Sequence, residues 1–577
     1  MTTLLNDPKD FPRQLAEGFV EANPQYVRAV FGGVVRATRS RPGKVAVISG
    51  GGTGHYPAFT GWVGQGLLDG VVTGNIFSSP SASQAVSVAR AADQGGGVFI
   101  AHLNYAGDVL HFGQAAERLR AEDVEVATAV VTDDVASAPA ATPQMRRGIA
   151  GGLPVFKITS AAAEAGLSLD EVVEVFHHAN NRVMTFGVAF SGCTLPGADH
   201  PLFEVPKGHI GVGLGVHGEP GIYETELGTA DDVAALLVDR LLEERPADGS
   251  RVIAMLNGLG SAKYEELFVT YTAVANRLRD AGVDIAEGEV GEFMTSLDMG
   301  GVSLTLVWLD ETLEPYYFAE CDTPAYKRRT PMAEPLPSDV VFNTEAEQLV
   351  VTRVASEKSR VTAGIVTEGL TLISEAIEAN ATALGDLDAI AGDGDHGIGM
   401  TRGSAAAAKA ARELFEQGAG AQTVLVGAGD RWSENAGGAS GALWGAALTA
   451  AGNVLGDTAP VDRDRQAQAL AALVEAIARL GGGSVGDKTM LDAMVPFADA
   501  FAAAVADGAS TAEAWKTAAD VAEAAATATA DLSPRLGRAR VLSDRSVGHP
   551  DPGAVSFALA AKTMAGVVQA SRTEQTV

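Results

Sequence analysis

The sequence predicts a chain in two parts, an α/β region with two subdomains followed by an all-α region. Short β-branched runs alternate with glycine loops and helical patterns up to about Glu320, and alanine-rich helical segments dominate from about Thr352. A proline-rich stretch that has neither a helical nor a strand pattern separates the two regions. At 577 residues the chain is also too long for one ordinary hydrophobic core, so two or more domains are expected.

The first part contains several strand candidates. Residues 44–49 (KVAVIS) form a buried-strand candidate, followed by a glycine loop and by Pro57, which we expect near a helix start. A second candidate, 97–101, precedes a loop and a helix-like stretch over 108–120. Further strand candidates lie at 124–131 and 153–158, and at 252–256 and 302–309, where they indicate a second sheet.

The domain boundaries follow from these textures. Residues 323–345 carry four prolines after Asp322 and have no regular period, which is typical of a linker. We therefore expect domains at 1–330 and 353–577, joined by a linker at 331–352. In the second part, helical segments are expected at 363–381, 400–416, 441–454, 465–480, 490–506, 511–530 and 554–570.

Composition excludes several classes of protein. A net charge of −30 opposes docking on nucleic acid or anionic membrane, while still allowing a phosphate-bearing ligand that helix N-termini and a divalent cation would hold. Two cysteines give no disulfide framework. The start, MTTLLNDPKDFPRQ, has no apolar core of the signal-peptide type, and no run of ~18 apolar residues occurs. These features predict a cytoplasmic protein.

An acidic loop, LGDLDAIAGDGDHGIGM, is the most specific feature of the second part. It crowds Asp388, Asp393 and Asp395 among glycines that would break a helix, and three converging carboxylates need a cation such as Mg²⁺. The alternative is an acidic surface turn with helix-capping aspartates. An EF-hand is excluded, because twelve positions counted from Asp393 place Ser404 where a bidentate Glu belongs.

Three glycine loops in the same part offer backbone amides to an anion. GGGSVGDKTM resembles a Walker loop, but Asp487 stands where the glycine before Lys488 is required, so a P-loop NTPase is excluded. Thr489, at an expected helix start, can still help to bind an anion. The other loops are 437–445 (GGASGALWG) and 537–554, which ends in a DPG turn. Each alone could be a simple turn; together with the acidic loop they favour a nucleotide site.

The first part offers two imidazoles and a carboxylate on loops. SGGGTGHYPAF follows a strand but lacks the dinucleotide pattern, because His55 occupies the last glycine position. Asp108 lies at a strand-to-helix junction in NYAGDVLHFG, where it could equally be a helix N-cap. Glycines around His217 in GVGLGVHGEPGIYE allow a ligand to approach its ring closely. A structural role remains open for each, and His177 and His178 are interpreted as structural.

Seven motifs taken in order, GGGTGH, NYAGD, GLGVHGEPG, GDGDHG, GGASGAL, GDKTMLDA and DPGA, resemble the ATP-dependent dihydroxyacetone kinase family over about residues 10–570. The resemblance implies a ketose-binding α/β domain, an eight-helix barrel that binds Mg–ATP, a homodimer, and in-line transfer of the γ-phosphate to a hydroxyl without a phosphoenzyme.

The resemblance also implies residue roles. In the family, the histidine at His217 forms a covalent hemiaminal with the ketose carbonyl, which selects ketoses over polyols. Asp108 and His55 match the groups that bind the hydroxyls and assist proton removal. The substrate loop matches Gly50, Gly51, Gly52 and Thr53; two Mg²⁺ ions match Asp388, Asp393 and Asp395; and the nucleotide contacts match Asp395, His396, Gly397, Ser440, Gly441, Gly481, Thr489, Met490, Asp551, Pro552 and Gly553.

One departure and several alternatives remain. Many family members carry a lysine where Leu103 stands, so we expect a more apolar pocket that tolerates a four-carbon ketose such as erythrulose. Other members cyclise FAD to a cyclic flavin phosphate with Mn²⁺, which is an alternative activity here. Phosphoprotein-dependent relatives split the two domains between chains, so fusion favours free ATP. A ketose-sensing co-regulator is disfavoured, because His217 and the aspartates are present. The sequence leaves the ketose and its enantiomer open.

Overall fold

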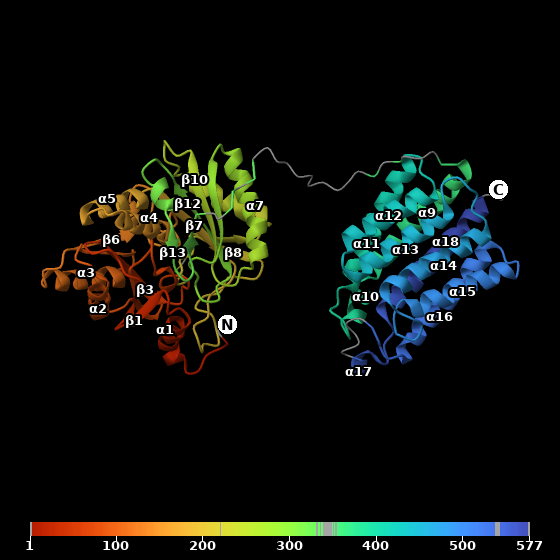
Figure 1. Cartoon of the computed structure of the whole chain (residues 1–577), viewed down its shortest axis with the longest axis horizontal. Coiled ribbons are helices and arrows are strands. Elements are labelled where there is room, and N and C mark those ends of the chain that lie inside the picture. Colours follow the sequence, from red (N-terminus) through yellow and green to blue (C-terminus); the bar gives the residue numbers. More distant parts are fainter. Residues whose placement is uncertain are drawn as a thin grey trace. The chain divides into compact units, whose positions relative to one another are not determined.

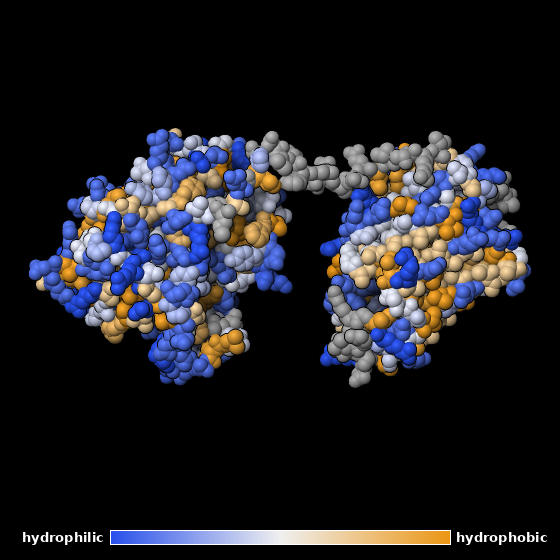
Figure 2. Space-filling view, in the orientation of Figure 1, coloured by the Kyte–Doolittle hydropathy of each residue, from blue (hydrophilic) through white to orange (hydrophobic). Residues whose placement is uncertain are grey.

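A computed structural model describes residues 3–219, 221–330, 333–334, 336–337, 349, 351, 355–536 and 543–574. The chain divides into two compact units, Met1–Pro337 and Ser338–Val577. Figure 1 colours the first from red to green and the second from green to blue. Most of the linker expected at 331–352 lies outside the described residues. Hydrophilic side chains cover much of the visible face of each unit, with apolar patches between them (Figure 2).

The first sheet of unit 1 is mainly parallel and has the strand order β1-β2-β4-β3-β5-β6. β3 pairs in parallel with both β4 and β5, and β5 pairs in parallel with β6, while β1 and β2 form an antiparallel edge hairpin. The carboxyl ends of the parallel strands therefore meet at one edge, where α/β sheets place ligand sites. The strands are β1 (Val27–Val30), β2 (Gly33–Arg36), β3 (Ala46–Thr53), β4 (Gly70–Ile76), β5 (Val98–Leu103) and β6 (Val126–Val131).

The second sheet is mainly antiparallel, in the order β11-β10-β12-β7-β8-β9, and only β10 and β11 run in parallel. It confirms the second sheet predicted from residues 252–256 and 302–309. The strands are β7 (Val183–Ala189), β8 (His209–Val212), β9 (Tyr223–Glu226), β10 (Arg251–Gly258), β11 (Asp284–Gly291) and β12 (Gly301–Trp308); β13 (Cys321–Asp322) and β14 (Lys327–Arg328) form a separate hairpin.

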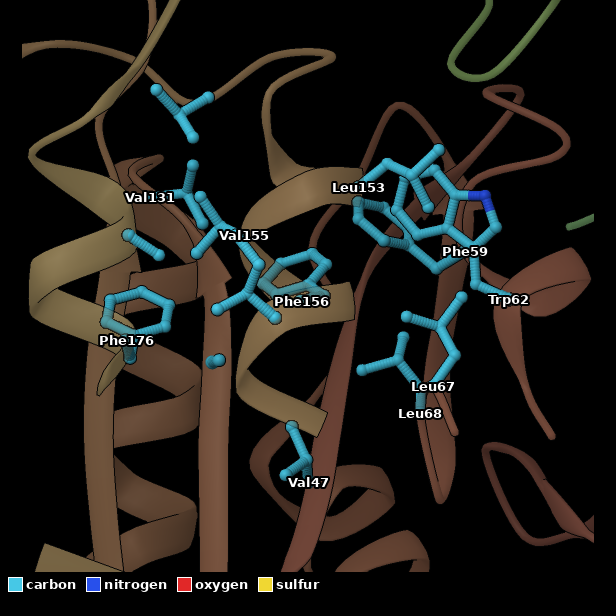
Figure 3. Close-up of a cluster of buried hydrophobic side chains, with 14 of the residues drawn as sticks. Val47, Phe59, Trp62, Leu67, Leu68, Val131, Leu153, Val155, Phe156 and Phe176 are labelled. Atoms are coloured by element: carbon cyan, nitrogen blue, oxygen red, sulfur yellow. The ribbon is translucent and has the colours of Figure 1, made fainter. Parts of the chain in front are cut away.

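Helices cover both sheets, and one of the apolar clusters of this unit includes residues of both sheets, such as Val47 and Ile253. On one face of the first sheet α2 (Ala82–Ala92) and α3 (Ala106–Arg120) bury apolar faces, and α4 (Gly152–Ala165) and α5 (Leu169–Asn180) bury theirs on the other. Figure 3 shows part of the apolar cluster between the first sheet and helices α4 and α5, which includes Trp62 and Phe156 together with Val47 of β3. The second sheet packs against α6 (Ala230–Leu242) and α7 (Tyr264–Asp280). Two further helices are α1 (Phe11–Ala22) and α8 (Glu314–Phe318).

One local prediction in this unit was wrong. The stretch 153–158 is a helix, not a strand, because it belongs to α4, whose residues Gly152 to Ala163 are all buried. A helix buried on every side has no polar face, so its apolar run cannot be told from a buried strand by periodicity. Pro57 does not start a helix; the next helical turn is the 3₁₀ segment Thr60–Trp62.

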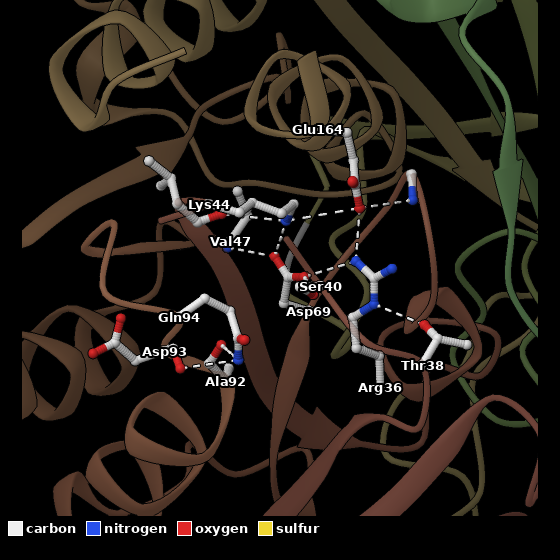
Figure 4. A network of polar contacts seen from close by, with 12 residues as sticks. Arg36, Thr38, Ser40, Lys44, Val47, Asp69, Ala92, Asp93, Gln94 and Glu164 are labelled. Carbon is white, nitrogen blue, oxygen red and sulfur yellow. Dashed lines mark hydrogen bonds and ion pairs between the residues drawn. The ribbon is translucent and has the colours of Figure 1, made fainter. Parts of the chain in front are cut away.

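A buried network of four charges ties β2, β3, β4 and α4 together (Figure 4). Lys44 Nζ lies 2.5 Å from Asp69 Oδ2, which also accepts a hydrogen bond from the Val47 amide at 2.9 Å. Arg36 reaches Asp69 Oδ1 at 3.0 Å and Glu164 at 2.6 Å. Lys44 and Asp69 are 1% and 2% exposed, so each charge depends on its partners for compensation.

Unit 2 is helical throughout its described part. The long helices pack as successive neighbours from α9 through α11, α12, α13, α14, α15 and α16 to α18, and α18 packs back on α9. They are α9 (Glu357–Ala379), α11 (His396–Glu416), α12 (Ala421–Ala436), α13 (Gly438–Leu455), α14 (Arg463–Gly481), α15 (Leu491–Ala506), α16 (Thr511–Ala528) and α18 (Pro552–Glu574); α10 (Ala381–Asp388) and α17 (Ser543–Ser546) are short.

Small residues let these helices approach closely. A Cβ at Gly403 would lie 2.4 Å from the Trp432 indole nitrogen, and one at Gly429 would lie 2.7 Å from the Gly445 carbonyl. The core between the helices contains an apolar cavity of about 230 Å³, which Trp432 and Trp444 help to line. Residues Pro552–Ser571 of α18 are long and apolar enough to span a membrane, but α18 packs between α16 and α9, as a core helix does.

Replacing Asp69 should destabilise the first unit. Asp69→Asn leaves Lys44 and Arg36 buried without their shared carboxylate, which should cost about 3–5 kcal/mol of unfolding free energy. Hydrogen–deuterium exchange of the β3 and β4 amides during a urea titration measures the loss. The exposed Asp199→Asn is the matched control. Unchanged protection in Asp69→Asn would show that the network contributes no stability.

Candidate active site

His217 is held by hydrogen bonds to both ring nitrogens. It lies in the loop between β8 and β9, where its Nδ1 is 3.0 Å from Glu219 Oε1 and its Nε2 is 3.0 Å from Nε2 of His55. The other oxygen of Glu219 accepts a hydrogen bond from the His217 amide, also at 3.0 Å. Although burial opposes ionisation, the hydrogen bonds and charge of His217 lower the pKa of Glu219 to about 2. Sequence reasoning missed Glu219.

Aromatic rings enclose the same imidazole. The rings of Tyr105 and Phe77 lie edge-on to His217, with centroids 4.8 Å and 5.1 Å away. Phe77 also stacks on His55 at 4.9 Å. The Tyr105 hydroxyl is buried without a hydrogen-bond partner. The ring of His217 is thus fixed in orientation while its side chain keeps 24% of its surface exposed, so a small ligand can reach it.

His55 follows the end of β3 and joins the two sheets of the unit. Its Nδ1 lies 2.8 Å from the Thr295 carbonyl, and its own carbonyl accepts the Thr295 amide at 3.2 Å. The Gly54 carbonyl accepts the Leu297 amide at 2.9 Å. Burial, and then the positive charge of His217, lowers the pKa of His55 to about 3, which keeps this ring neutral.

Asp108 is the third residue of α3, not its N-cap, which is Tyr105. Its carboxyl is hydrogen-bonded to Ser79, a residue that was not selected from the sequence, while Oδ1 is buried without a partner. Burial raises the pKa of Asp108 to about 6. A carboxyl of this kind accepts a proton near neutral pH, and its free oxygen is available to a hydroxyl group.

The loop at the end of β3 needs glycine at several positions for steric reasons. A Cβ at Gly50 would lie 2.3 Å from the Val72 carbonyl, and one at Gly52 would lie 2.6 Å from the Ser78 amide. Gly51, Gly52 and Thr53 help to line a cavity of about 420 Å³ beside α1. Thr53 Oγ1 is buried and unpaired, so the loop retains polar capacity.

Leu103 does not have the contacts expected of a pocket wall. It is 3% exposed and belongs to the cluster that includes Leu153 and Phe156. Its side chain packs where Cβ atoms at Gly148 and Gly152 would stand, with Cδ2 at 2.9 Å and 3.0 Å from those positions. The apolar pocket wall that we expected at Leu103 is therefore a core contact. The two histidines interpreted as structural lie on α5, where His178 pairs with Asp310.

In unit 2 the structure brings the three aspartates of the acidic loop together. Asp388 ends α10, Asp395 is the N-cap of α11, and Asp393 lies between them. One carboxylate oxygen from each lies within 4.8 Å of the others. The turn needs Gly394, which has a φ of 78°, and a Cβ at Gly392 would lie 2.3 Å from Asp388 Oδ1. Such a cluster of oxygen ligands suits a hard divalent cation.

Four helix starts meet beside this cluster, as their side-chain contacts show. His396 Nε2, at the start of α11, lies 3.0 Å from the Ser556 hydroxyl near the start of α18. Ser440, at the start of α13, contacts Met400 of α11. Met490, just before α15, lies 3.3 Å from where a Cβ of Gly553 would stand. Helix N-termini carry partial positive charge, so four of them beside carboxylates fit a polyphosphate with its cation.

The loop before α15 is organised by Lys488 and Asp492, neither of which was selected from the sequence. Lys488 is buried and donates to the carbonyls of Leu532 and Ser546 at 3.0 Å and 2.7 Å, so it does not act as a Walker lysine. Asp492 was missed; its Oδ2 accepts the Thr489 amide at 2.7 Å. Gly481 ends α14 beside Leu443 of α13.

The DPG turn caps the last helix. Asp551 Oδ1 accepts the Ala554 amide at 2.8 Å. Burial, assisted by the nearby charge of Asp492, raises the pKa of Asp551 to about 7. Gly397 and Gly441 allow close helix approach: a Cβ at Gly397 would lie 2.0 Å from the Ala381 carbonyl. Residues 537–542 of the preceding segment lie outside the described residues.

Comparisons with known proteins agree with this division. The Dak1 domain matches residues 17–325, and the DAK2 domain matches residues 390–566. The chain is 52% identical to D-erythrulose kinase from Mycolicibacterium smegmatis, over 99% of both chains. It is 51% identical to L-erythrulose kinase from Pectobacterium atrosepticum, over 99% of this chain and 98% of the relative.

More distant relatives extend the same picture. Human triokinase/FMN cyclase is 34% identical over 92% of both chains. Among solved structures, the dihydroxyacetone kinase of C. freundii in complex with AMP-PNP and Mg²⁺ is 30% identical and aligns with a TM-score of 0.60, over 98% of this chain and 99% of that one. Two matching domains in one chain, with relatives of this identity along nearly its whole length, show that the chain belongs to the dihydroxyacetone kinase family.

Proposed function

We propose that this chain is an ATP-dependent ketose kinase, which transfers the γ-phosphate of ATP to a hydroxyl of dihydroxyacetone or of a four-carbon ketose such as erythrulose. The single observation that carries the proposal is the setting of His217, a partly exposed imidazole fixed between Glu219 and His55. The acidic cluster in unit 2 supplies the complementary site, where a cation and polyphosphate fit. The named kinases with which the chain aligns support the same reaction.

In the ketose site, we assign His217 Nε2 as the nucleophile that adds to the ketose carbonyl and forms a hemiaminal. A polyol has no carbonyl, so this bond selects ketoses. His55 and Asp108 bind the hydroxyl groups, and Asp108 accepts the proton of the attacking hydroxyl through its unpaired Oδ1. Gly50, Gly51, Gly52 and Thr53 line the substrate.

In the nucleotide site, we assign two Mg²⁺ ions to Asp388, Asp393 and Asp395. When bound, Mg²⁺ neutralises charge on the phosphate oxygens during in-line transfer. The converging helix starts support a polyphosphate at this position, and the closed order of helix contacts supports an eight-helix barrel. The proposed nucleotide contacts are Asp395, His396, Gly397, Ser440, Gly441, Gly481, Thr489, Met490, Asp551, Pro552 and Gly553.

The two units support the proposed domains, a ketose domain at 1–330, a linker at 331–352 and a nucleotide domain at 353–577, since the units divide between Pro337 and Ser338. We also propose a homodimer, in which the nucleotide domain of one chain serves the ketose domain of the other. A cytoplasmic location is supported by the net charge of −30 and by the metabolic kinases among the relatives.

The identity of the ketose is inferred from the relatives of the chain. The relatives that act on D- and L-erythrulose are 52% and 51% identical to this chain, so overall identity favours a four-carbon ketose but neither enantiomer. The 34% identity with triokinase/FMN cyclase supports a second candidate activity, cyclisation of FAD, which assays of FAD turnover with Mn²⁺ test. A ketose-sensing co-regulator is disfavoured because the acidic cluster is intact.

Removing the imidazole of His217 should abolish selection for ketoses. In a coupled ATP-consumption screen of dihydroxyacetone, D- and L-erythrulose and glycerol, His217→Ala should lose at least tenfold in kcat/KM for each ketose and should no longer prefer ketoses to glycerol. ATP binding should stay unchanged, because the nucleotide site lies in unit 2. The exposed His200→Ala is the control. A variant that keeps the ketose preference would refute the covalent tether.

Activity should fall with acidity as Asp108 becomes protonated. Because burial raises the pKa of this carboxyl to about 6, its base form is lost as the pH falls through that value, and kcat/KM should fall with it. Asp108→Asn should lower kcat by about 10²–10⁴-fold, and the fall in activity at acidic pH should disappear from its pH–rate profile. A pH–rate profile from pH 5 to 8 measures both. An acid limb that survives in Asp108→Asn would belong to another group.

The acidic cluster should set the Mg²⁺ requirement. Asp388→Asn or Asp395→Asn removes one of three converging carboxylates, so the Mg²⁺ concentration for half-maximal activity should rise at least tenfold. Calorimetric titration of ATP at fixed Mg²⁺ checks the same effect on binding. Asp386→Asn, an exposed change in the same short helix, is the matched control. Equal Mg²⁺ dependence in all three variants would exclude the cluster as the metal site.

A further inference from the structure

The loop that carries His217 is rich in glycine. Residues 213–222, between β8 and β9, include four glycines and a proline. Gly213 and Gly218 adopt φ angles of 74° and 80°, and glycine loses more conformational freedom on ordering than any other residue. Backbone hydrogen bonds close the loop at its stems, where the amides of Gly213 and Ile222 donate at 2.8 Å and 2.7 Å. The stems alone leave the position of His217 open, so side chains outside the loop should help to set it.

Arg147 reaches this loop from the segment between β6 and α4. Its Nη2 donates a hydrogen bond to the Gly213 carbonyl at 3.2 Å, and its Nη1 lies 3.9 Å from Oε2 of Glu219. Gly213 begins the loop, and Glu219 binds both the amide and the ring of His217. One guanidinium therefore contacts the loop on both sides of the histidine along the chain.

Arg147 is itself fixed to the segment that follows β6. Its Nε and Nη2 lie 2.9 Å and 2.8 Å from Oδ2 of Asp134, whose side chain is 2% exposed. Its carbonyl accepts the Asp134 amide at 3.2 Å, and its amide donates to Ser137 Oγ at 2.9 Å. These bonds hold the guanidinium in one orientation. The loop of the second sheet is thus tied to the first sheet, which also carries His55 and Asp108.

Gly215 leaves the space that this contact requires. A Cβ at Gly215 would lie 2.1 Å from Oε2 of Glu219 and 2.6 Å from Nη1 of Arg147. Both distances are too short for a real contact, so the carboxylate and the guanidinium fill the space that a side chain would take. The loop, Glu219 and Arg147 are therefore packed together as one unit.

We propose that Arg147 is a positioning residue for the ketose tether, which holds the loop so that His217 meets the carbonyl carbon of the substrate. This rests on the covalent tether proposed above. Neutralising the buried Asp134 would need only a positive charge, whereas a guanidinium directs separate N–H groups at Asp134 and at the loop. A reacting group that is displaced by about 1 Å can lose about 10²-fold in rate.

Arg147→Lys tests the proposal. Lysine keeps a positive charge beside Asp134, but its single nitrogen cannot also reach Gly213 and Glu219. The KM for dihydroxyacetone should therefore rise by about tenfold or more, because His217 is no longer held in place. The KM for ATP should not change, because the nucleotide site lies in unit 2. A ketose KM that stays at the wild-type value would overturn the proposal.

Arg182→Lys is the matched control. Arg182 also donates to a carbonyl and to a carboxylate, those of Trp308 at 2.8 Å and Asp248 at 3.1 Å. It lies just before β7, whereas β8 pairs with the other end of that strand. Its replacement should leave the KM for dihydroxyacetone and the KM for ATP at their wild-type values.

Gly215→Ala disturbs the same contact from the loop and leaves the buried Asp134 paired. Its methyl group would displace Glu219 or Arg147, so the KM for dihydroxyacetone should again rise while the KM for ATP stays the same. Gly113→Ala on α3 is the control, because nothing lies within 4 Å of the added Cβ. Thermal unfolding followed by circular dichroism checks that each variant is folded.

A double-mutant cycle with His217→Ala separates positioning from a general structural role. Without the imidazole, activity no longer depends on where the loop holds it. Adding Arg147→Lys to His217→Ala should then change kcat/KM for dihydroxyacetone by less than about twofold, since two residues that act through one group are not additive. Equal losses in both backgrounds would show that Arg147 only supports the fold.

The carbon-13 signal of carbonyl-labelled dihydroxyacetone, bound to the full chain, distinguishes failure of this proposal from failure of the tether. In the wild type the labelled carbon should be tetrahedral, and Arg147→Lys should form less adduct at the same ketose concentration. If the carbon stays trigonal in the wild type while phosphorylation proceeds, the covalent tether is wrong. If the wild type and Arg147→Lys form the adduct equally, only the role of Arg147 is overturned.

Discussion

The backbone hydrogen bonds between the end of β3 and residues 295–297 help to bring His55 and His217 together. The two sheets of the first unit share one apolar cluster, which includes Val47 of the first sheet and Ile253 and Val307 of the second, and each sheet also has a cluster of its own. The bonds from Thr295 to His55 and from Leu297 to Gly54 join the sheets at the carboxyl end of a parallel strand. These bonds and the shared cluster bring an imidazole from one sheet against an imidazole from the other, and neither sheet alone could supply both rings.

In unit 2 the main constraint is electrostatic. Three carboxylates within 4.8 Å repel one another, and the fold tolerates them beside the starts of α11, α13, α15 and α18, where helix N-termini carry partial positive charge. The side-chain contacts among these helix starts, such as that from His396 to Ser556, keep the loops in place. Helix packing accounts for glycines of α11, as Gly397 and Gly403 show.

The sequence predicted more of the layout than of the individual contacts. The strands predicted at 44–49, 97–101 and 124–131 correspond to β3, β5 and β6, because short β-branched runs between glycine turns are distinctive. Asp388, Asp393 and Asp395 were predicted to converge because they are closely spaced on one glycine loop. The 153–158 helix was missed because burial on all sides removes the polar face that reveals a helix. Glu219 and Asp492 were missed although each lies two or three residues from a selected residue, a spacing at which a carboxylate can bond back to a turn.

The contacts of Lys488 affect where unit 2 can accept insertions. Its single ammonium binds the carbonyls of Leu532 and Ser546, so both stems of the intervening segment are anchored at one point of the loop before α15. When the two ends of a segment are held together, lengthening the segment adds little to the free energy of closing it. This is because the entropic cost of closure rises only with the logarithm of the length. Insertions between these stems should leave α18 and its DPG turn in register, which makes this segment a natural place for lineages to diverge or for a protein engineer to graft new sequence.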